Sequence, residues 1–382
     1  MKQRLTHGGG GTSGLMVIDA VTGRQVCGRA VDRARPLASN MKLFTTSTAL
    51  ARLGPDIRIP TKVLSDGRLD QDGILHGSLY LQGGGDPALG SPAFYDRFRG
   101  GLGTNLFALK RQIRVAGIRA VTGRLFADDT VFDRLRGVAD SGFAVSPYIG
   151  PLSGLAFDSG YSGPDGRSFA RDPAKTAATA LARSLRKAGV RVRARVALRA
   201  APAEARGVAT IRSPSLTRLV EQTAVYSDNF YAETLLKLIG ARLGDEGSTA
   251  AGAEVVARFA RSLGSDVHAV DGSGLTRSNR ASPAQVVRLL QGVRGTEVGD
   301  EFIQDLALAG REGTVADRMH GSAAEGRCRT KTGTLTGVSN LSGYCFNRSG
   351  RVMIFSVLMG SVRDLSLAHY EQDRIAAAVA GY

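Results

Sequence analysis

The alternation of apolar and polar positions predicts two strands and a helix near the N-terminus. Residues 14–32 form two short alternating segments around a turn at Thr22-Gly23. Residues 40–54 carry apolar side chains at helical spacing, and Gly54-Pro55 gives the punctuation expected at the end of a helix. The apolar stripe of this helix comprises Leu43, Phe44, Leu50 and Leu53.

The pattern changes between residues 59 and 211, where short alternating segments are separated by glycine-rich turns. The segments predict strands within 61–65, 77–82, 118–128, 190–199 and 207–212. Two helices are expected near 92–116 and 172–188. This stretch is typical of a mixed second domain.

Helical periodicity dominates after residue 213, and three strands follow it. Helices are expected at 215–224, 229–243, 249–264, 282–293 and 299–309, strands at 327–335, 340–347 and 351–359, and a closing helix at 363–380. The last strand is a continuous apolar run, which indicates a central buried strand. We therefore expect strands from both chain ends to share one sheet. One domain would comprise 1–58 and 212–382, and 59–211 would be inserted into it.

Length and composition are those of a globular protein. The chain has 382 residues, of which 43% are hydrophobic and 22% charged, and this length favours two domains. No apolar run reaches the roughly 18 residues of a membrane span. Residues 1–14 begin with basic side chains but contain no apolar signal-peptide core. The chain is therefore expected to be cytosolic, or to lack its export segment as given.

The formal net charge of +16 suits an anionic partner. The 42 Arg against 8 Lys are equally typical of an arginine-rich genome, and the arginines are scattered. Nucleic-acid binding is therefore not expected. Attraction to an anionic cell-wall polymer remains an alternative.

The 3 cysteines are too few for a disulfide scaffold. Cys328 and Cys345 flank a predicted hairpin symmetrically, so they are placed to face each other across two strands. A disulfide between them, with Cys27 free, and three reduced thiols are both compatible with the sequence.

The first candidate for chemistry is the pair Ser39 and Lys42, at the start of the predicted helix 40–54. Residues at i and i+3 share a helix face, and free N–H groups at a helix start favour negative charge. A neutral lysine amine can take the proton of a serine, and burial or a neighbouring cation lowers the lysine pKa. Arginine stays protonated and cannot do this, which explains a lysine in a chain that prefers arginine.

The S-x-x-K pattern is weak alone, and Ser184 with Lys187 also matches it. Ser184 lies late in a predicted helix, where free N–H groups are absent, so we interpret it as structural. Two further triplets support Ser39: Ser227-Asp228-Asn229 before a predicted helix, and Lys331-Thr332-Gly333 on a predicted strand. The trio S-x-x-K, S-D-N and K-T-G, in this order, is the signature of penicillin-binding proteins and serine β-lactamases.

The spacing narrows the resemblance. Ser39 and Ser227 are 188 residues apart, and Ser227 and Lys331 are 104 apart. Such a long first gap resembles the class C low-molecular-mass penicillin-binding proteins, the D-alanyl-D-alanine carboxypeptidase/endopeptidase family. Segments 79–89, 121–133 and 270–283 also look like that family, and the resemblance covers about 14–380. The insertion looks shorter than usual, and the N-terminal helix that precedes the first strand in that family is absent or a remnant.

The resemblance implies an α/β (α+β) transpeptidase-like fold, an antiparallel sheet flanked by helices, with an inserted α/β domain. It also implies a serine D-Ala-D-Ala carboxypeptidase or endopeptidase that acts on peptidoglycan peptides and is inhibited by β-lactams. No metal or cofactor is implied, and the location would be extracytoplasmic, periplasmic or attached to the cell wall. The implied catalytic residues are Ser39, Lys42, Ser227, Asn229 and Lys331, and the implied substrate-binding residues are Asp228, Thr332, Gly333 and Thr334.

In the implied mechanism Ser39 is the acylating nucleophile and Lys42 its general base. Lys331 supplies positive charge that keeps Lys42 neutral and attracts the substrate carboxylate. Ser227 relays a proton to the leaving amine, Asn229 holds Lys42 and the substrate amide, and the N–H groups of Ser39 and Thr334 form the oxyanion hole.

Other functions are less consistent with the sequence. There are 5 histidines but no G-x-S-x-G elbow for a Ser-His-Asp hydrolase, and no H-E-x-x-H for a zinc hydrolase. Gly9 to Gly14 match G-x-G-x-x-G but precede a strand, so a flexible N-terminal tail is expected there. The remaining alternatives are a β-lactamase or esterase on the same fold and a non-catalytic wall-binding protein.

Overall fold

The computed structural model describes residues 1–347 and 349–382, and the chain divides into two compact units. The first unit contains Met1–Pro55, Leu216–Gly244 and Thr249–Tyr382, and the second contains Asp56–Ser215 with Asp245–Ser248. The chain thus leaves the first unit once for a long excursion and returns to it.

The first unit is built on a six-stranded antiparallel sheet with the order β15-β16-β17-β18-β1-β2. The strands are β1 (Gly14–Asp19), β2 (Gln25–Arg29), β15 (Ala307–Leu308), β16 (Cys328–Leu335), β17 (Val338–Phe346) and β18 (Val352–Gly360). Strand β18 lies between β17 and β1, and all but its end residues are buried. This confirms the prediction of a central strand and of one sheet shared by both chain ends.

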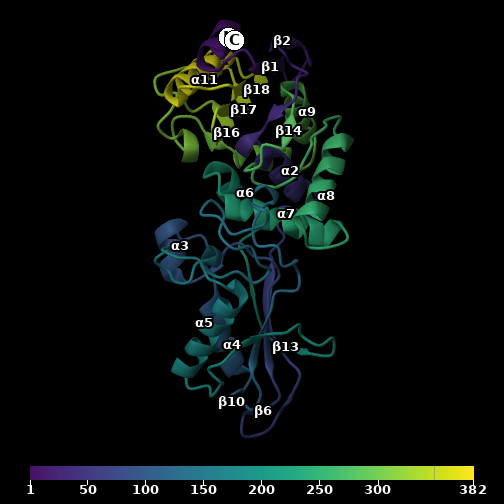
Figure 1. Cartoon of the computed structure of the whole chain (residues 1–382), viewed down its shortest axis with the longest axis vertical. Coiled ribbons are helices and arrows are strands. Elements are labelled where there is room, and N and C mark those ends of the chain that lie inside the picture. The colour runs from purple at the N-terminus through teal and green to yellow at the C-terminus, as the bar shows by residue number, and fades with distance from the viewer. Residues whose placement is uncertain (348) are drawn as a thin grey trace. The chain divides into compact units, whose positions relative to one another are not determined.

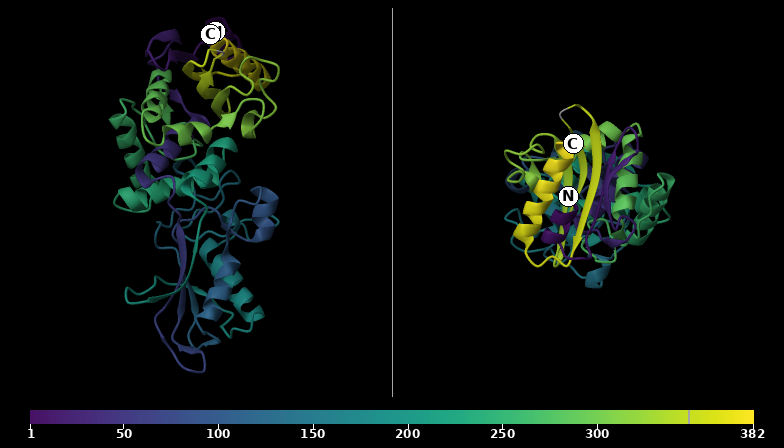
Figure 2. Two further views of the ribbon diagram at one scale, coloured as in Figure 1. Left: turned by 180° about the vertical axis from the view of Figure 1, so that it is seen from behind. Right: turned by 90° about the horizontal axis from the view of Figure 1, so that it is seen from above.

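Two helices cover one face of this sheet, α1 (Lys2–Gly8) and α11 (Leu365–Ala380). Figure 2 shows α11 beside the strands, with both chain termini close to it. Apolar residues of the two helices, among them Leu5 and Ile375, share a core with Leu15, Leu341 and Phe355 of the sheet. Helix α9 (Pro283–Arg294) also packs on β1 and β18, and Tyr344 Oη of β17 donates to its Leu290 carbonyl at 2.7 Å.

The helix before the first strand, which the resemblance implies to be absent or a remnant, is present as a short helix of 7 residues, α1. Leu5 is fully buried in the core. Arg4 Nη1 lies 3.0 Å and His7 Nδ1 2.7 Å from the carboxylate of Glu371 on α11. A single apolar side chain and a shared carboxylate fix this short helix, which local sequence propensity alone would leave marginal.

The remaining elements of the first unit support the nucleophile region. The helices are α2 (Met41–Leu53), α6 (Leu216–Val225), α7 (Asn229–Leu243), α8 (Thr249–Ser262) and α10 (Gly299–Gln304), with 3-10 turns η1 (Ala38–Asn40) and η5 (Gly313–Val315) and the short ladder β3 (Arg35–Pro36) with β14 (Arg280–Ala281). Helix α2 packs against α6, α7 and α8 (Figure 1). The helix expected at 299–309 ends at Gln304, because Ala307 and Leu308 pair with β16 instead.

The second unit has a five-stranded mixed sheet with the order β12-β11-β7-β4-β13. Its strands are β4 (Pro60–Ser65), β7 (Leu79–Gln82), β11 (Leu125–Asp128), β12 (Ala197–Leu198) and β13 (Arg206–Arg212). A small sheet contains β5 (Arg68–Leu69), β6 (Ile74–His76) and β10 (Ala120–Val121), and β8 (Leu89–Gly90) pairs with β9 (Thr104–Asn105). The turns η3 (Ala139–Ser141) and η4 (Asp158–Gly160) lie in the connections.

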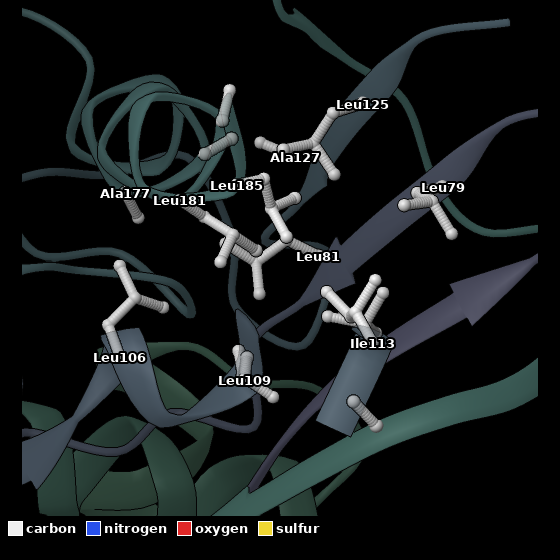
Figure 3. Close-up of a cluster of buried hydrophobic side chains, with 14 of the residues drawn as sticks. Leu79, Leu81, Leu106, Leu109, Ile113, Leu125, Ala127, Ala177, Leu181 and Leu185 are labelled. Carbon is white, nitrogen blue, oxygen red and sulfur yellow. The ribbon is translucent and has the colours of Figure 1, made fainter. Parts of the chain in front are cut away.

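Helices α4 (Leu109–Val115) and α5 (Pro173–Lys187) close the core of the second unit, with turn η2 (Leu106–Ala108). Figure 3 shows Leu181 and Leu185 of α5 beside Leu81 of the sheet, and Ala177 of the same helix belongs to the same cluster. The sequence predicts a strand within 190–199, but only Ala197–Leu198 forms one, β12, which pairs with β11. In the rest of the segment Val190 and Val192 are buried, and Arg191 forms a single bridge to Ala120.

The single helix expected at 92–116 is two helices, α3 (Pro92–Phe98) and α4, separated by a turn and β9. Gly100 and Gly101 both have positive φ, 55° and 83°, which ends the first helix. A Cβ at Gly103 would lie 1.9 Å from the Tyr95 ring, so the chain folds back directly on α3. Glycine backbone freedom overrides the helical periodicity here.

The cysteine alternative is decided by the register of β16 and β17. Cys328 and Cys345 are directly opposite, with a Cα–Cα distance of 4.0 Å, and form a disulfide, while Cys27 is free and half-buried. The disulfide closes a loop over a sequence separation of 17 residues, which restricts the unfolded chain.

Replacing both Cys328 and Cys345 with alanine is expected to lower the free energy of unfolding by about 3 kcal/mol. Urea unfolding with and without a thiol reductant measures this. The reductant should lower the wild-type midpoint and leave that of the double variant unchanged. The control Cys27→Ala should respond to reductant as wild type does, and a reductant-insensitive wild type would contradict the disulfide.

Candidate active site

Ser39 lies in turn η1, directly before α2, and its side chain is half-buried. Ala38 before it has φ 45°, an uncommon conformation for a residue with a side chain. Gly274 packs against this strained turn: a Cβ there would lie 1.8 Å from the Ala38 carbonyl oxygen. The turn that presents Ser39 is therefore held by backbone contact that only glycine permits.

Lys42 occupies the first turn of α2 and is fully buried. Its Nζ lies 3.0 Å from Ser39 Oγ, 2.7 Å from Asn229 Oδ1 and 2.7 Å from the Ser273 carbonyl oxygen. The amide and carbonyl oxygens can only accept hydrogen bonds. A neutral amine therefore donates its two hydrogens to them, and its lone pair is left for the Ser39 hydroxyl.

The S-D-N triplet forms the turn that begins α7. Ser227 is half-buried and has φ 60°. Asp228 caps the helix, because its carboxylate accepts from the Tyr231 N–H at 3.1 Å. Asn229 is the first residue of α7 and binds Lys42 as described. The cap fixes the helix start that directs Asn229 at Lys42, and this gives Asp228 a structural task that sequence reasoning did not assign.

The K-T-G triplet lies in β16, and its backbone contacts the Ser39 turn directly. Asn40 Nδ2 donates to the Lys331 carbonyl at 3.0 Å. A Cβ at Gly333 would lie 3.0 Å from Asn40 N and 3.1 Å from Ser39 N, tighter than ordinary van der Waals contact. Glycine thus lets the strand approach the nucleophile turn.

Beyond Thr330, β16 has a neighbouring strand on one side only among the residues that the structure describes. Strand β15 pairs with Arg329 and Thr330, whereas β17 pairs along the whole of β16. The edge of β16 around 332–334 can therefore pair with an extended peptide. Thr334 is exposed there, and Thr332 Oγ1 donates to Thr314 Oγ1 at 2.9 Å.

The site contains two fully buried lysines, Lys42 and Lys331. Burial lowers the pKa of Lys42 to about 8, although Asp271, Glu233 and Asp228 act in the opposite direction. The pKa of Lys331 is lowered well below its usual value, first by burial and then by the charge of Lys42. Desolvation thus favours the neutral amine at both lysines, and the charge of Lys42 further disfavours a charge on Lys331.

A loop to which the sequence analysis assigned no role, residues 271–274, holds the third partner of Lys42. Glu233 Oε1 accepts from the N–H groups of Gly272 at 2.9 Å and Ser273 at 2.7 Å. Asp271 accepts from Gly274 N at 2.7 Å and from Asn279 Nδ2 at 2.6 Å. This loop belongs to segment 270–283, which resembles the family in sequence but for which the sequence predicts no catalytic residue. Glu233 stands four residues after Asn229, so helical spacing would have placed both on one face of α7.

The structure thus brings Ser39, Lys42, Asn229 and the strand carrying Lys331 and Gly333 to one place in the first unit. Ser227 lies on the turn beside Asn229, and its Oγ makes no hydrogen bond to another described residue. Ser184, the second S-x-x-K serine, is on α5 of the second unit, and its Lys187 is exposed.

Within residues 1–347 and 349–382, no cluster of His, Cys, Asp or Glu has the composition of a metal site. In the same residues, no helix combines the length and apolar character needed to cross a membrane.

The sequence of the chain resembles those of known carboxypeptidases. The D-Ala-D-Ala carboxypeptidase 3 (S13) family matches residues 3–168 and 161–380. The D-alanyl-D-alanine carboxypeptidase of Actinomadura sp. (strain R39) is 30% identical over 455 aligned positions, which cover 98% of this chain and 82% of that protein.

Solved structures show the same fold. Penicillin-binding protein 4 of Haemophilus influenzae superposes with a TM-score of 0.83 at 20% identity, over 100% of this chain and 99% of that one. A predatory endopeptidase of Bdellovibrio bacteriovorus, in complex with its immunity protein, gives a TM-score of 0.61 over 96% and 92% of the two chains. The expected fold, with its antiparallel sheet flanked by helices, is confirmed, and by its sequence the chain belongs to the S13 family of D-Ala-D-Ala carboxypeptidases.

Proposed function

We propose that this chain is a serine D-alanyl-D-alanine carboxypeptidase or endopeptidase that acts on peptidoglycan stem peptides through an acyl-enzyme on Ser39. One observation carries the assignment of roles: of the three groups around Lys42 Nζ, only the Ser39 hydroxyl has a proton to give. Membership of the S13 family supports the substrate class.

In the acylation step, Ser39 Oγ attacks the carbonyl carbon of the D-Ala-D-Ala bond while its proton passes to Lys42 Nζ. The negative charge that develops on the carbonyl oxygen is stabilised by the N–H groups of Ser39 and Thr334. Thr334 belongs to β16. The close approach of Gly333 to Ser39 supports this pairing of donors from two elements.

The C–N bond then breaks, and the leaving amine needs the proton that Lys42 holds. Ser227 Oγ is the relay that we assign, because its hydroxyl is half-buried beside Asn229 and is not engaged by another described residue. Water hydrolyses the Ser39 ester by the same route in reverse, with Lys42 again as base.

The substrate would lie as an extended strand along the free edge of β16. Its terminal carboxylate would meet Lys331 and the hydroxyls of Thr332 and Thr334, and Asp228 would act at this site through the turn that it caps. A carboxypeptidase releases terminal D-Ala, and an endopeptidase releases the amine of a cross-link; both leaving groups are amines and use the same steps.

The substrate places the working protein outside the cytoplasm, at the cell wall. In a β-lactam, a reactive carbonyl and a carboxylate are arranged as the scissile carbonyl and the terminal carboxylate are in the peptide substrate. We therefore propose that β-lactams acylate Ser39. A structure of H. influenzae penicillin-binding protein 4 in complex with a β-lactam has a TM-score of 0.81 to this chain.

The variant Ser39→Ala should lose both covalent labelling by a fluorescent penicillin and D-Ala release from a synthetic stem peptide, because it lacks the attacking oxygen. Gel fluorescence and intact-protein mass spectrometry measure the adduct. Ser184→Ala, the other S-x-x-K serine, is the matched control and should label as wild type does. Labelling that persists in Ser39→Ala would remove Ser39 from the mechanism. Fast turnover of a chromogenic cephalosporin without an adduct would favour a β-lactamase.

The variant Lys42→Arg should slow acylation by about 10³-fold or more, because a guanidinium keeps its proton and cannot act as base. The second-order rate of penicillin labelling measures the loss. Lys62→Arg, at an exposed lysine, is the control for the same chemical change. Circular dichroism of both variants checks that they are folded, and a folded Lys42→Arg with wild-type rate would rule out the base.

The rate of acylation should rise with pH. Because the pKa of Lys42 is lowered to about 8, its neutral form grows about tenfold per pH unit below that value and levels off above it. Labelling rates measured between pH 6 and 9.5 should follow this curve. A rate that is flat or falls over this range would show that a neutral Lys42 is not required.

A further inference from the structure

The second unit contains a cleft of about 980 Å³ beside α5. We call it the α5 cleft. It is formed by α5 and its N-cap region together with residues from the segments 91–110 and 157–164. All of its lining residues belong to the second unit, so the α5 cleft is separate from the Ser39 site.

Helix α5 presents one face to the core and another to the cleft. Ala177, Leu181 and Leu185 point into the core (Figure 3). Thr179 and Arg183, one turn apart, face the cleft on the other side. The helix is fixed by its apolar face, so its polar face is presented in a defined position.

The cleft is strongly cationic. Six basic side chains line it, against two carboxylates, Asp158 and Asp172. Asp158 is buried and already accepts from Ser91 N at 2.6 Å and Ser91 Oγ at 3.1 Å, while Asp172 caps α5 and pairs with Lys175 at 3.3 Å. The basic residues are Lys110, Arg171, Lys175, Arg183, Arg186 and Lys187.

Apart from Lys175, these basic side chains make no ion pair and donate no hydrogen bond to any residue that the structure describes. Like charges gathered without partners repel one another and destabilise the folded chain. Three of the chain's 8 lysines, Lys110, Lys175 and Lys187, lie here, although arginine is the usual cation in this protein. An anionic ligand would remove the repulsion.

The walls of the cleft suit a ligand that also has sugar rings. Phe107 is half-buried and lies edge to face with the buried Phe157, with ring centroids 6.0 Å apart, so Phe107 supplies the aromatic surface open to a ligand. Hydroxyls of Thr176, Thr179 and Ser184 stand beside the cations. The volume is that of sites that enclose a ligand of a few rings.

We propose that the α5 cleft binds an anionic carbohydrate segment of the cell wall, whose carboxylate or phosphate groups meet Arg183, Arg186 and Lys187. The assignment of the anion to the cell wall rests on the proposed function of the Ser39 site. The cationic character of the cleft is independent of that function. Bound in this way, the second unit would hold the enzyme on its polymeric substrate.

The test compares two triple variants with the same loss of charge, each in a Ser39→Ala background that prevents turnover. Arg183→Gln/Arg186→Gln/Lys187→Gln alters the cleft, and Arg242→Gln/Arg261→Gln/Arg288→Gln removes exposed helical arginines of the first unit. Binding is measured by co-sedimentation with insoluble peptidoglycan, with its phosphate polymers and after hydrofluoric acid has removed them. Circular dichroism confirms that both are folded.

The cleft variant should bind about tenfold more weakly and with a smaller dependence on salt, whereas the first-unit variant should change binding less than about twofold. A loss seen only with untreated walls identifies phosphate as the anion, and a loss with both identifies carboxylate. Equal weakening by the two variants, or no binding by the parent, would overturn the proposal.

A separate measurement keeps this proposal apart from the enzymatic one. With Ser39 restored, both triple variants should release D-Ala from a small soluble stem peptide at the wild-type rate, because neither alters the Ser39 site. If no form of the protein releases D-Ala, the proposed function fails. The difference in wall binding between the two triple variants still tests whether the α5 cleft binds the anionic ligand.

Discussion

The fully buried amine of Lys42, which lies among three oxygen atoms, is the constraint around which the first unit is arranged. Two of its partners, Asn229 Oδ1 and the Ser273 carbonyl, are obligate acceptors, and the third is the Ser39 hydroxyl. A buried amine is costly unless its hydrogens are satisfied, and the cost is smaller for the neutral form. The burial that accompanies folding therefore lowers the pKa of Lys42, and the same packing places its Nζ within 3.0 Å of Ser39 Oγ.

Helix α7 and strand β16 together hold the partners of Lys42. Asp228 caps α7 and so fixes Asn229. Glu233, one turn further along α7, holds the loop whose Ser273 carbonyl meets the amine. The strand β16 approaches from the other side through Gly333. A small shift in either element would leave a buried polar group without its partner, which is energetically costly.

The second unit is organised differently. Its apolar groups are gathered between α5, α4 and the sheet, and its cations are directed outward into a cleft. The first unit buries three lysines, and burial lowers the pKa of the two at the site, Lys42 and Lys331, whereas the lysines of the second unit are exposed. The same residue type serves proton transfer in one place and attraction of anions in the other, and burial is the difference.

The sequence by itself determined the elements, the order of the motifs and the residues expected to react, because these depend on local periodicity and on residue chemistry. It placed β18 in the centre of a sheet and Ser39 at the start of α2. Only the tertiary structure decided that residues 2–8 form a helix, that α3 and α4 are separate, and that Ala307 and Leu308 join the sheet. It alone showed the supports of Lys42 in Glu233 and the 271–274 loop, and the cationic cleft of the second unit. The separation of α3 from α4 depends on local glycine backbone conformation, which overrides the helical periodicity. In the other cases the deciding contact joins residues that are distant along the chain or depends on burial, and neither is encoded in local spacing.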